Sequence, residues 1–395
     1  MSNTIDVIGP DRRQDNGDAL ERAVDVQATQ GGHLERLESA AIAIKRSREA
    51  LKEVALTLRA ELGVQRSRRV ADQRLQWIVP VTQPIMLCSQ IQRSGGTLVA
   101  RLFDGHRACF AHPYELRWGR PEKGHWPALE KDGTPDALLA QLDEGWPRRF
   151  ASKGYHKYTD WTHRNDPDAA RHYPFVFDEE LQYRVFAAVL GAMPGRSQRS
   201  CLNAYLTSLF NAWLDYQNLY GTPKQWVTAF FPRSIMEPDG PDRFFADYPD
   251  GLLVTLVREP RGWLSSFSRH VATAGTEEAI DLWVESANAS RRAQAARPDR
   301  VIVLLFEDLV HRTEAVVRLL CERMGLSFSR VLLEPTFNSM PVLSDSSHVL
   351  TTGIDREVTE RHLATLTSEQ VERVARKATP HYEKIRERYR ITTPA

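Results

Sequence analysis

Short apolar runs alternate with segments of helical periodicity through most of the chain. The clearest runs are PIMLCSQI at 84–91, GLLVTLV at 251–257 and VIVLLF at 301–306. Segments with apolar residues three or four apart follow these runs, at 97–103, 261–271 and 314–325. Continuous apolar strands that alternate with helices are typical of a parallel sheet covered on both faces. The pattern therefore predicts a three-layer α/β domain over residues 80–395, with a central, mostly parallel sheet.

A stretch from about 120 to 225 interrupts this alternation with helical patterns of its own. Asp178 is suited to cap one helix, and Ser197 or Ser200 is suited to cap a second that carries large aromatic and aliphatic side chains over 202–214. Apolar residues on adjoining faces of this second helix favour burial in the core over an acceptor pocket. We expect a helical insertion on the acceptor side of the domain.

The N-terminal part of the chain has a different composition. Residues 1–32 are rich in Asp, Gln, Asn and Gly and have few large apolar side chains, so we expect them to be disordered. Aliphatic residues then recur every three or four positions, which predicts one long amphipathic helix over 33–75. Because its heptad pattern is short and is interrupted at Arg48, the stripe over 33–62 could pack on its own domain or form a homodimer.

Charge and composition exclude several classes of protein. The 52 Lys and Arg residues balance 51 Asp and Glu residues, which argues against a general nucleic-acid or membrane-surface binder. No apolar stretch approaches the ~20 residues of a membrane span, and the polar N-terminus lacks a signal-peptide core. The four cysteines form no CxxC pair, so neither a zinc site nor a disulfide framework is indicated. These features predict a cytoplasmic protein whose anion sites are local.

A glycine-rich turn, SQIQRSGGTL, joins the first predicted strand to its helix. It offers close backbone approach, hydroxyl groups and a guanidinium through Arg93, Ser94, Gly95, Gly96 and Thr97. Backbone N–H groups and the helix dipole would point at one oxyanion there. The nucleotide-triphosphatase pattern GxxxxGK[ST] is absent, because Gly96 and not lysine precedes Thr97. Metal-chelated ATP is therefore disfavoured, although a turn without any ligand is an equally simple interpretation.

A second set of anion donors follows the run at 251–257. Arg258 ends this strand, Pro260 suits the first turn of a helix, and Ser266 lies eight residues after the arginine. In a doubly wound sheet, ligands bind outside the carboxyl ends of neighbouring strands, so both loops could face one nucleotide with separated phosphates. Taken alone, Arg258 could equally form a surface ion pair.

Three motifs in the same order then resemble a known family. QRSGGTL, VREPRGWLSSF and LLFEDLVHRTEAVVRLLCERMGLSF are similar to the sulfotransferases that use 3′-phosphoadenosine 5′-phosphosulfate (PAPS). The resemblance covers roughly 84–116 and 250–335. It implies a P-loop-like fold of the bacterial type and in-line transfer of a sulfuryl group from PAPS to an acceptor hydroxyl, with release of 3′,5′-ADP. It also implies that no metal takes part, which fits the missing lysine.

The resemblance assigns roles to individual residues. It implies that the first loop binds the 5′-phosphosulfate through Arg93, Ser94, Gly95, Gly96, Thr97 and Leu98. It implies that Arg258 and Ser266 bind the 3′-phosphate, whereas Glu307 and Asp308 are interpreted as structural. Arg93 is also expected at the bridging oxygen, where negative charge develops as the bond to sulfur breaks.

Two residues are candidates for the base that takes the acceptor proton. Pro-Tyr-Glu, ending at Glu115, matches the Pro-x-Glu setting of a glutamate base in several sulfotransferase branches, so Glu115 is the preferred catalytic base. His112 is the alternative. If neither interpretation holds, Glu115 pairs with Arg117 or Arg120 at the surface.

The acceptor is expected to be a small molecule or a carbohydrate, but no motif identifies it. Lys153 and Lys157 lie among aromatic residues in a mixture that suits a polar, sugar-like acceptor, although such clusters are most often solvated loops. The segment 338–355 loosely resembles a serine-rich region that closes over the nucleotide in some relatives. Both assignments stay open.

Two other functions compete with sulfuryl transfer. A P-loop-like ATP-dependent kinase would require Mg²⁺. A non-catalytic nucleotide-binding scaffold would act through the 33–62 helix and would be stabilised by 3′,5′-ADP without sulfating any acceptor.

Overall fold

The computed structural model describes residues 68–118, 125–153, 173–271, 273–342, 353–361 and 365–392, together with isolated helical positions between 43 and 65. The chain divides into two compact units, Met1–Arg69 and Val70–Ala395. In the first unit the described positions are helical and exposed. The predicted segment 1–32 and most of the predicted helix over 33–75 lie outside the described residues.

Five parallel strands form the central sheet of the second unit, in the order β2-β3-β1-β4-β5. They are β1 (Ile85–Cys88), β2 (Cys109–Glu115), β3 (Trp226–Phe230), β4 (Leu252–Val257) and β5 (Val301–Leu305). The three predicted strands are present as β1, β4 and β5. Strands β2 and β3 were not predicted. A 3₁₀ helix of three residues follows β3, so this strand lacks the strand–helix alternation of the others, and β2 contains Pro113, which is tolerated at a sheet edge but is a poor strand signal.

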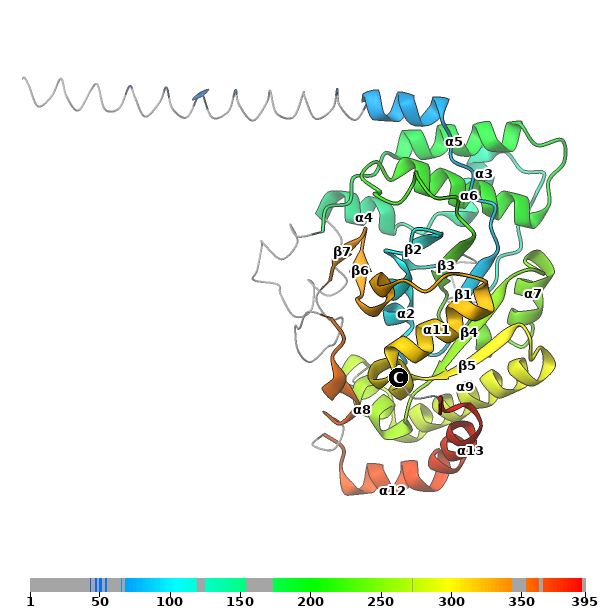
Figure 1. Cartoon of the computed structure of the whole chain (residues 1–395), viewed down its shortest axis with the longest axis vertical. Coiled ribbons are helices and arrows are strands. Elements are labelled where there is room, and N and C mark those ends of the chain that lie inside the picture. Colours follow the sequence, from blue (N-terminus) through cyan, green and yellow to red (C-terminus); the bar gives the residue numbers. More distant parts are fainter. Residues whose placement is uncertain are drawn as a thin grey trace, which may run out of the picture. The chain divides into compact units, whose positions relative to one another are not determined.

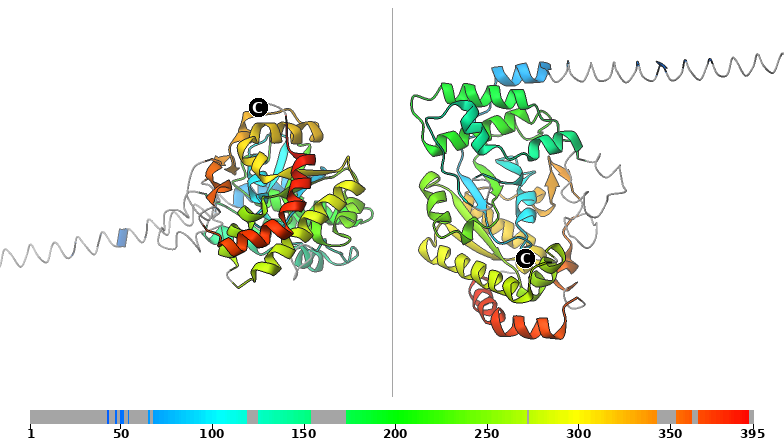
Figure 2. Two further views of the ribbon diagram at one scale, coloured as in Figure 1. Left: turned by 90° about the horizontal axis from the view of Figure 1, so that it is seen from below. Right: turned by 180° about the vertical axis from the view of Figure 1, so that it is seen from behind.

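Helices cover both faces of this sheet (Figures 1 and 2). On one face, α2 (Gly96–Phe103) and α11 (Thr313–Met324) share a core with Met86 and Cys88 of β1. On the other face, Ile85 and Leu87 pack in a core with α6 (Gln198–Ala212) and α7 (Gly240–Asp247). Since successive strand residues point to opposite faces, one apolar strand supplies both cores. The predicted three-layer α/β class is confirmed.

Helices of the described residues also fill the stretch between β2 and β3. They are α3 (Pro135–Leu142), α4 (Trp146–Lys153), α5 (Glu179–Gly191) and α6. Asp178 caps α5, because its Oδ1 accepts a hydrogen bond from the Leu181 amide at 2.9 Å. Ser197, and not Ser200, is the N-cap of α6. Every residue of α6 from Cys201 to Ala212 is buried, which confirms that this aromatic helix belongs to the core.

The remaining elements lie after β3. They are η2 (Ser234–Met236), α8 (Pro260–His270), α9 (Thr276–Ala296), α10 (Phe306–His311), η3 (Arg330–Leu333), β6 (Thr336–Phe337), β7 (Met340–Pro341), η4 (Arg356–Thr359), α12 (Ser368–Lys377) and α13 (Thr379–Tyr389). The short strands β6 and β7 pair antiparallel, apart from the main sheet. Figure 1 shows α12 and α13 at the end of the unit opposite α5 and α6.

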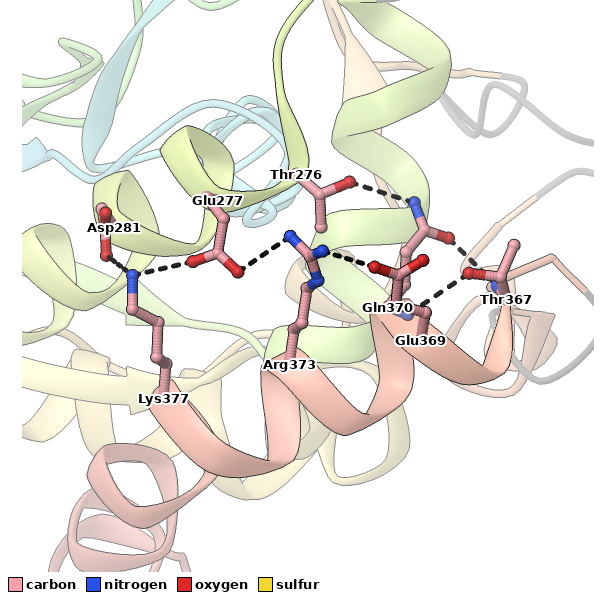
Figure 3. Close-up of polar contacts among 8 residues, drawn as sticks. All are labelled: Thr276, Glu277, Asp281, Thr367, Glu369, Gln370, Arg373 and Lys377. Atoms are coloured by element: carbon pink, nitrogen blue, oxygen red, sulfur yellow. Dashed lines mark hydrogen bonds and ion pairs between the residues drawn. The ribbon is translucent and has the colours of Figure 1, made fainter.

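Exposed ion pairs join α12 to α9 (Figure 3). Lys377 Nζ lies 2.9 Å from Glu277 Oε2 and 2.7 Å from Asp281 Oδ1. Arg373 Nη1 lies 3.1 Å from the second oxygen of Glu277, and Arg373 also pairs with Glu369 of its own helix. These contacts lower the pKa of Glu277, chiefly through its hydrogen bond with Lys377.

We expect Glu277→Gln to lower the melting temperature slightly, and this difference from wild type to depend on pH and salt. A depressed carboxyl pKa adds stability above the ordinary glutamate pKa of ~4.3, and that stability is lost as pH falls through the lower folded value. The difference should therefore vanish in acid and in ~1 M NaCl, where screening acts over ~3 Å. Glu383→Gln, which removes an exposed pair within α13, is the control. A difference that persists in salt would contradict an electrostatic role.

Candidate active site

The loop between β1 and α2 is held in an unusual backbone conformation. Arg93 has φ 70° and Gly95 has φ 98°, both left-handed. For a residue other than glycine this conformation costs about 1–3 kcal/mol and is most often kept at ligand sites. Helix α2 begins at Gly96 with no side-chain cap at Gly95, and the backbone N–H groups at the start of a helix have no acceptor within that helix. These groups and the start of α2 therefore form a site suited to an oxyanion.

Both glycines of the loop lie against protein side chains. A Cβ atom on Gly95 would lie 2.6 Å from Cδ2 of Phe306. On Gly96 it would lie 2.0 Å from Nε2 of Gln90 and 2.4 Å from Cε2 of Phe230. Gln90 and Phe230 are buried and have little room to move. The glycines thus allow close packing within the protein, besides the close approach to a ligand that the sequence suggested.

Gly96→Ala is expected to destabilise the fold by about 1–3 kcal/mol, because the new methyl group overpacks a filled core. Gly191→Ala is the matched control: it also places alanine in a helix, where nothing lies within 4 Å of the new atom. It should stabilise α5 by ~0.5–1 kcal/mol. Denaturant unfolding of both variants measures the difference, and an equal effect at the two positions would contradict the packing argument.

Arg258 reaches from the end of β4 to the loop after β1. Its Nη1 donates to the Arg93 carbonyl at 3.0 Å, and its Nη2 donates to the Val358 carbonyl at 3.1 Å. The guanidinium carbon lies 4.5 Å from the centre of the Phe306 ring. Burial lowers the pKa of Arg258 to about 10, so the buried group remains charged at neutral pH. Arg93 and Arg258, predicted from separate motifs, thus share one surface.

Ser266 of α8 completes this cluster. Arg93 Nε donates to its hydroxyl oxygen at 3.0 Å. Pro260 occupies the first turn of α8, as predicted, and Glu259 caps the helix by accepting from the Gly262 amide at 2.8 Å. The structure therefore brings together three of the predicted binding residues, Arg93, Arg258 and Ser266.

Glu307 lies next to the cluster of Arg93, Arg258 and Ser266 and binds the backbone that follows Arg258. Its Oε1 accepts from the Glu259 amide at 3.0 Å, and its Oε2 accepts from the Tyr382 hydroxyl at 2.9 Å. Burial raises its pKa. The neighbouring Asp308 accepts from the Ile391 amide at 2.9 Å. These bonds to other protein groups agree with the structural interpretation of both carboxylates.

Glu115 lies at the end of β2, in register with Phe230 of β3, which is itself in register with Cys88 of β1. Two strand spacings, roughly 10 Å, therefore separate Glu115 from the end of β1. Its side chain is half-buried. His112 is buried on the same strand, with Nδ1 2.7 Å from the Tyr114 carbonyl oxygen and Nε2 3.1 Å from Glu144 Oε2. Protein groups engage both ring nitrogens of His112.

Arg233 is a basic residue of this region that sequence reasoning missed. It follows β3, which lies between β2 and β1. Its φ is 70°, its amide donates to the Gln90 carbonyl at 2.9 Å, and its Nε donates to Gln92 Oε1 at 2.9 Å. The Arg233 side chain thus contacts the loop after β1 from the end of β3, the strand that lies between β1 and the strand of Glu115. The only signal in the sequence is a Pro-Arg pair after the apolar run WVTAFF.

Several other candidates lie outside the described residues. They include Lys157, most of the segment 338–355 and the side chain of Lys153. In the part of the chain that the structure describes, no three His, Cys, Asp or Glu side chains lie close enough to hold a metal ion. Nor do the described helices include one with the length and apolar character of a membrane span.

The comparison with protein families decides the relationship. The sulfotransferase family model matches residues 84–330, more than half of the chain. The chain belongs to the sulfotransferase family. In this sulfotransferase the matched region begins just before β1 and ends after α11, so it includes the loop after β1, Arg233, Arg258 and Ser266.

Solved structures with similarity to this sulfotransferase include other members of the family. The sulfotransferase domain from the curacin biosynthetic pathway is 19% identical, with a TM-score of 0.45 over 74% of this chain and 97% of that chain. The sulfotransferase domain of the Synechococcus PCC 7002 olefin synthase is 18% identical, with a TM-score of 0.44 over 75% of this chain and 96% of that chain. Retinol dehydratase, solved in complex with androsterone and inactive cofactor PAP, is 14% identical, with a TM-score of 0.34 over 82% of this chain and 88% of that chain. No curated protein matches the chain.

Proposed function

We propose that this sulfotransferase moves the sulfuryl group of PAPS to a hydroxyl of a small-molecule or carbohydrate acceptor and releases 3′,5′-ADP. The observation that carries the proposal is the 3.0 Å hydrogen bond from Arg258 Nη1 to the Arg93 carbonyl. It joins the end of β4 to the loop after β1, so anion donors from two strand ends form one surface. A nucleotide with phosphates at both its 3′ and 5′ positions needs such a surface.

Different residues bind the two anionic ends of the nucleotide. The loop amides and hydroxyls after β1 hold the 5′-phosphosulfate, through Ser94, Gly95, Gly96, Thr97 and Leu98. Arg258 and Ser266 hold the 3′-phosphate. We place the Arg93 guanidinium with this second group and not at the bridging oxygen, because its Nε donates to Ser266 at 3.0 Å.

Arg233 is the proposed cation beside the bridging oxygen and the sulfuryl group, the role that the sequence analysis gave to Arg93. It follows the strand between Glu115 and the nucleotide loop, and its Nε contacts Gln92 at 2.9 Å. A guanidinium retains its proton near neutral pH, so it would stabilise charge on the sulfuryl and bridging oxygens without acting as an acid.

Glu115 is the proposed base. The acceptor oxygen attacks sulfur in line, its proton passes to the Glu115 carboxylate, and the S–O bond to the nucleotide breaks with its electron pair on the 5′-phosphate oxygen. His112 is less suited to this task, because its two ring nitrogens contact the Tyr114 carbonyl and Glu144. Glu115, at the end of the strand, is only half-buried.

Incubation with sulfur-labelled PAPS tests the proposal. The full-length protein is mixed with labelled PAPS, EDTA and either 2-naphthol or a metabolite extract, and sulfated products are identified by mass spectrometry. We expect labelled product and a higher melting temperature with 3′,5′-ADP. In a parallel incubation with ATP and Mg²⁺ and without EDTA, Mg²⁺-dependent transfer of phosphate would instead identify a kinase. Stabilisation by 3′,5′-ADP without any sulfated product would favour a non-catalytic scaffold.

A further inference from the structure

We propose that Glu144 is a positioning residue that sets the place of Glu115, an inference that rests on the proposed function of Glu115 as the base. Glu144 lies between α3 and α4, and its side chain is fully buried. Its Oε2 lies 3.1 Å from His112 Nε2 and accepts from the Tyr205 hydroxyl at 2.8 Å. Its Oε1 accepts from the Arg117 amide at 2.8 Å. One carboxylate thus contacts the chain on both sides of Glu115.

The strand that carries Glu115 is irregular just before it. Ala111 is in register with Thr228 and Glu115 with Phe230, so four steps along β2 oppose two steps along β3. Residues 112–114 therefore form a bulge on the edge strand of the sheet. Bulges near active sites redirect the side chains that follow them. The direction of Glu115 accordingly depends on what holds this bulge.

Contacts from α2, from His112 of the bulge itself and from β3 hold the bulge in place. Arg101 Nη2 of α2 donates to the Pro113 carbonyl at 2.6 Å. His112 Nδ1 lies 2.7 Å from the Tyr114 carbonyl oxygen. After the bulge, the Leu116 amide donates to the Phe230 carbonyl at 2.8 Å, which restores the ladder. Glu144 adds the contact that joins the bulge to the insertion helices.

The His112 ring is held from both of its nitrogens. Nδ1 lies 2.7 Å from the Tyr114 carbonyl oxygen and 3.4 Å from the Tyr114 amide nitrogen. Nε2 faces the Glu144 carboxylate at 3.1 Å. Such a buried, hydrogen-bonded pair fixes the ring rigidly, and removal of one partner leaves the other unsatisfied. The ring orientation, and through it the bulge, therefore depends on the Glu144 carboxylate.

The nucleotide-binding residues are expected to be insensitive to Glu144. They follow β1 and β4, which are two and three strands away from β2 in the sheet. A displacement of the base by ~1 Å can slow transfer by ~100-fold. Loss of Glu144 should therefore reduce kcat and leave nucleotide affinity nearly unchanged, which a general structural role would not do selectively.

The experiment compares Glu144→Gln and Glu144→Ala with Asp104→Asn. Asp104 is the matched control, because it is also a buried carboxylate and accepts from Thr336 Oγ1 at 2.9 Å and from the Ser339 amide at 2.8 Å. It lies at the opposite end of α2 from the loop. Measurements are kcat and KM for 2-naphthol sulfation, Kd for 3′,5′-ADP, and a crystal structure of Glu144→Gln.

We expect both Glu144 variants to lose about 100-fold in kcat with nucleotide Kd unchanged within about twofold, and Glu115 to be displaced in the crystal. Asp104→Asn should lower the melting temperature by about as much as the Glu144 variants do, but its kcat should equal that of wild type. The proposal is overturned if Glu115 keeps its place in Glu144→Gln, or if kcat falls no more than in the control. Should wild type fail to sulfate 2-naphthol, the crystal structure alone decides the positioning role. A displaced Glu115 would then support it, although the proposed reaction on that acceptor would have failed.

Discussion

Arg258→Met is expected to weaken 3′,5′-ADP binding by about 100- to 1000-fold. Arg258 is 5% exposed, and its guanidinium is oriented before any ligand binds, because it donates to the carbonyls of Arg93 and Val358. A charged hydrogen bond to a phosphate contributes at least ~1.5 kcal/mol, so two bonds at this lower limit give a change of this size in Kd. Methionine keeps most of the buried volume, and titration calorimetry measures the affinity.

Arg243→Met is the control for the change in charge. Arg243 of α7 forms an exposed ion pair with Asp239, and α7 precedes β4, so it lies at the end of that strand opposite Arg258. It should bind 3′,5′-ADP like wild type. Arg258→Lys retains the charge but not the planar fork, and we expect intermediate affinity. Wild-type affinity in Arg258→Met, with the protein folded, would refute the assignment of the 3′-phosphate site.

Glu115→Gln is expected to lower kcat by a factor of about 100 to 10,000, the contribution typical of general base catalysis. Glutamine preserves the size of the side chain but cannot take the acceptor proton. The Kd for 3′,5′-ADP should stay within about twofold, since Glu115 ends β2 and the nucleotide loops follow β1 and β4. Steady-state kinetics with 2-naphthol and calorimetry separate the two quantities.

Two further variants sharpen this test. Glu115→Asp keeps a carboxylate but withdraws it by one methylene, so kcat should fall less than in Glu115→Gln. Glu130→Gln removes an exposed carboxylate of the insertion and should leave kcat unchanged. If Glu115→Gln lowers kcat and raises the Kd for 3′,5′-ADP by the same factor, Glu115 belongs to the nucleotide site and is not the base.

Features encoded by neighbouring residues were predictable from the sequence. The strands β1, β4 and β5 are mainly apolar runs, and Asp178 and Ser197 cap helices through bonds to amides three residues away. The grouping of Arg93 with Arg258 was also predictable, because parallel strands place their carboxyl ends at one edge of a sheet.

Features that depend on distant contacts were not predictable. Strand β3 follows the insertion and precedes only a three-residue 3₁₀ helix, so the strand–helix alternation does not indicate it, and Arg233 is marked only by the Pro-Arg pair after an apolar run. Glu144 stands between Asp143 and Gly145 in what reads as a polar loop. Its contacts with His112, Arg117 and Tyr205, between 27 and 61 residues away, distinguish it from a solvated carboxylate.

The packing of Gly96 has a consequence for how loops of this kind diverge. In a GxxxxGK[ST] loop aligned on Gly95 and Thr97, the lysine stands at position 96 and the first glycine at position 90, which is Gln90 here. A Cβ atom at position 96 would lie 2.0 Å from that glutamine's amide nitrogen. Gly96→Lys in this loop therefore requires the Gln90 side chain and the Phe230 ring to shift, whereas a loop with glycine at position 90 lacks the first of these contacts. Exchange of the phosphosulfate loop for a triphosphate loop thus involves the packing beneath the loop as well as its lysine.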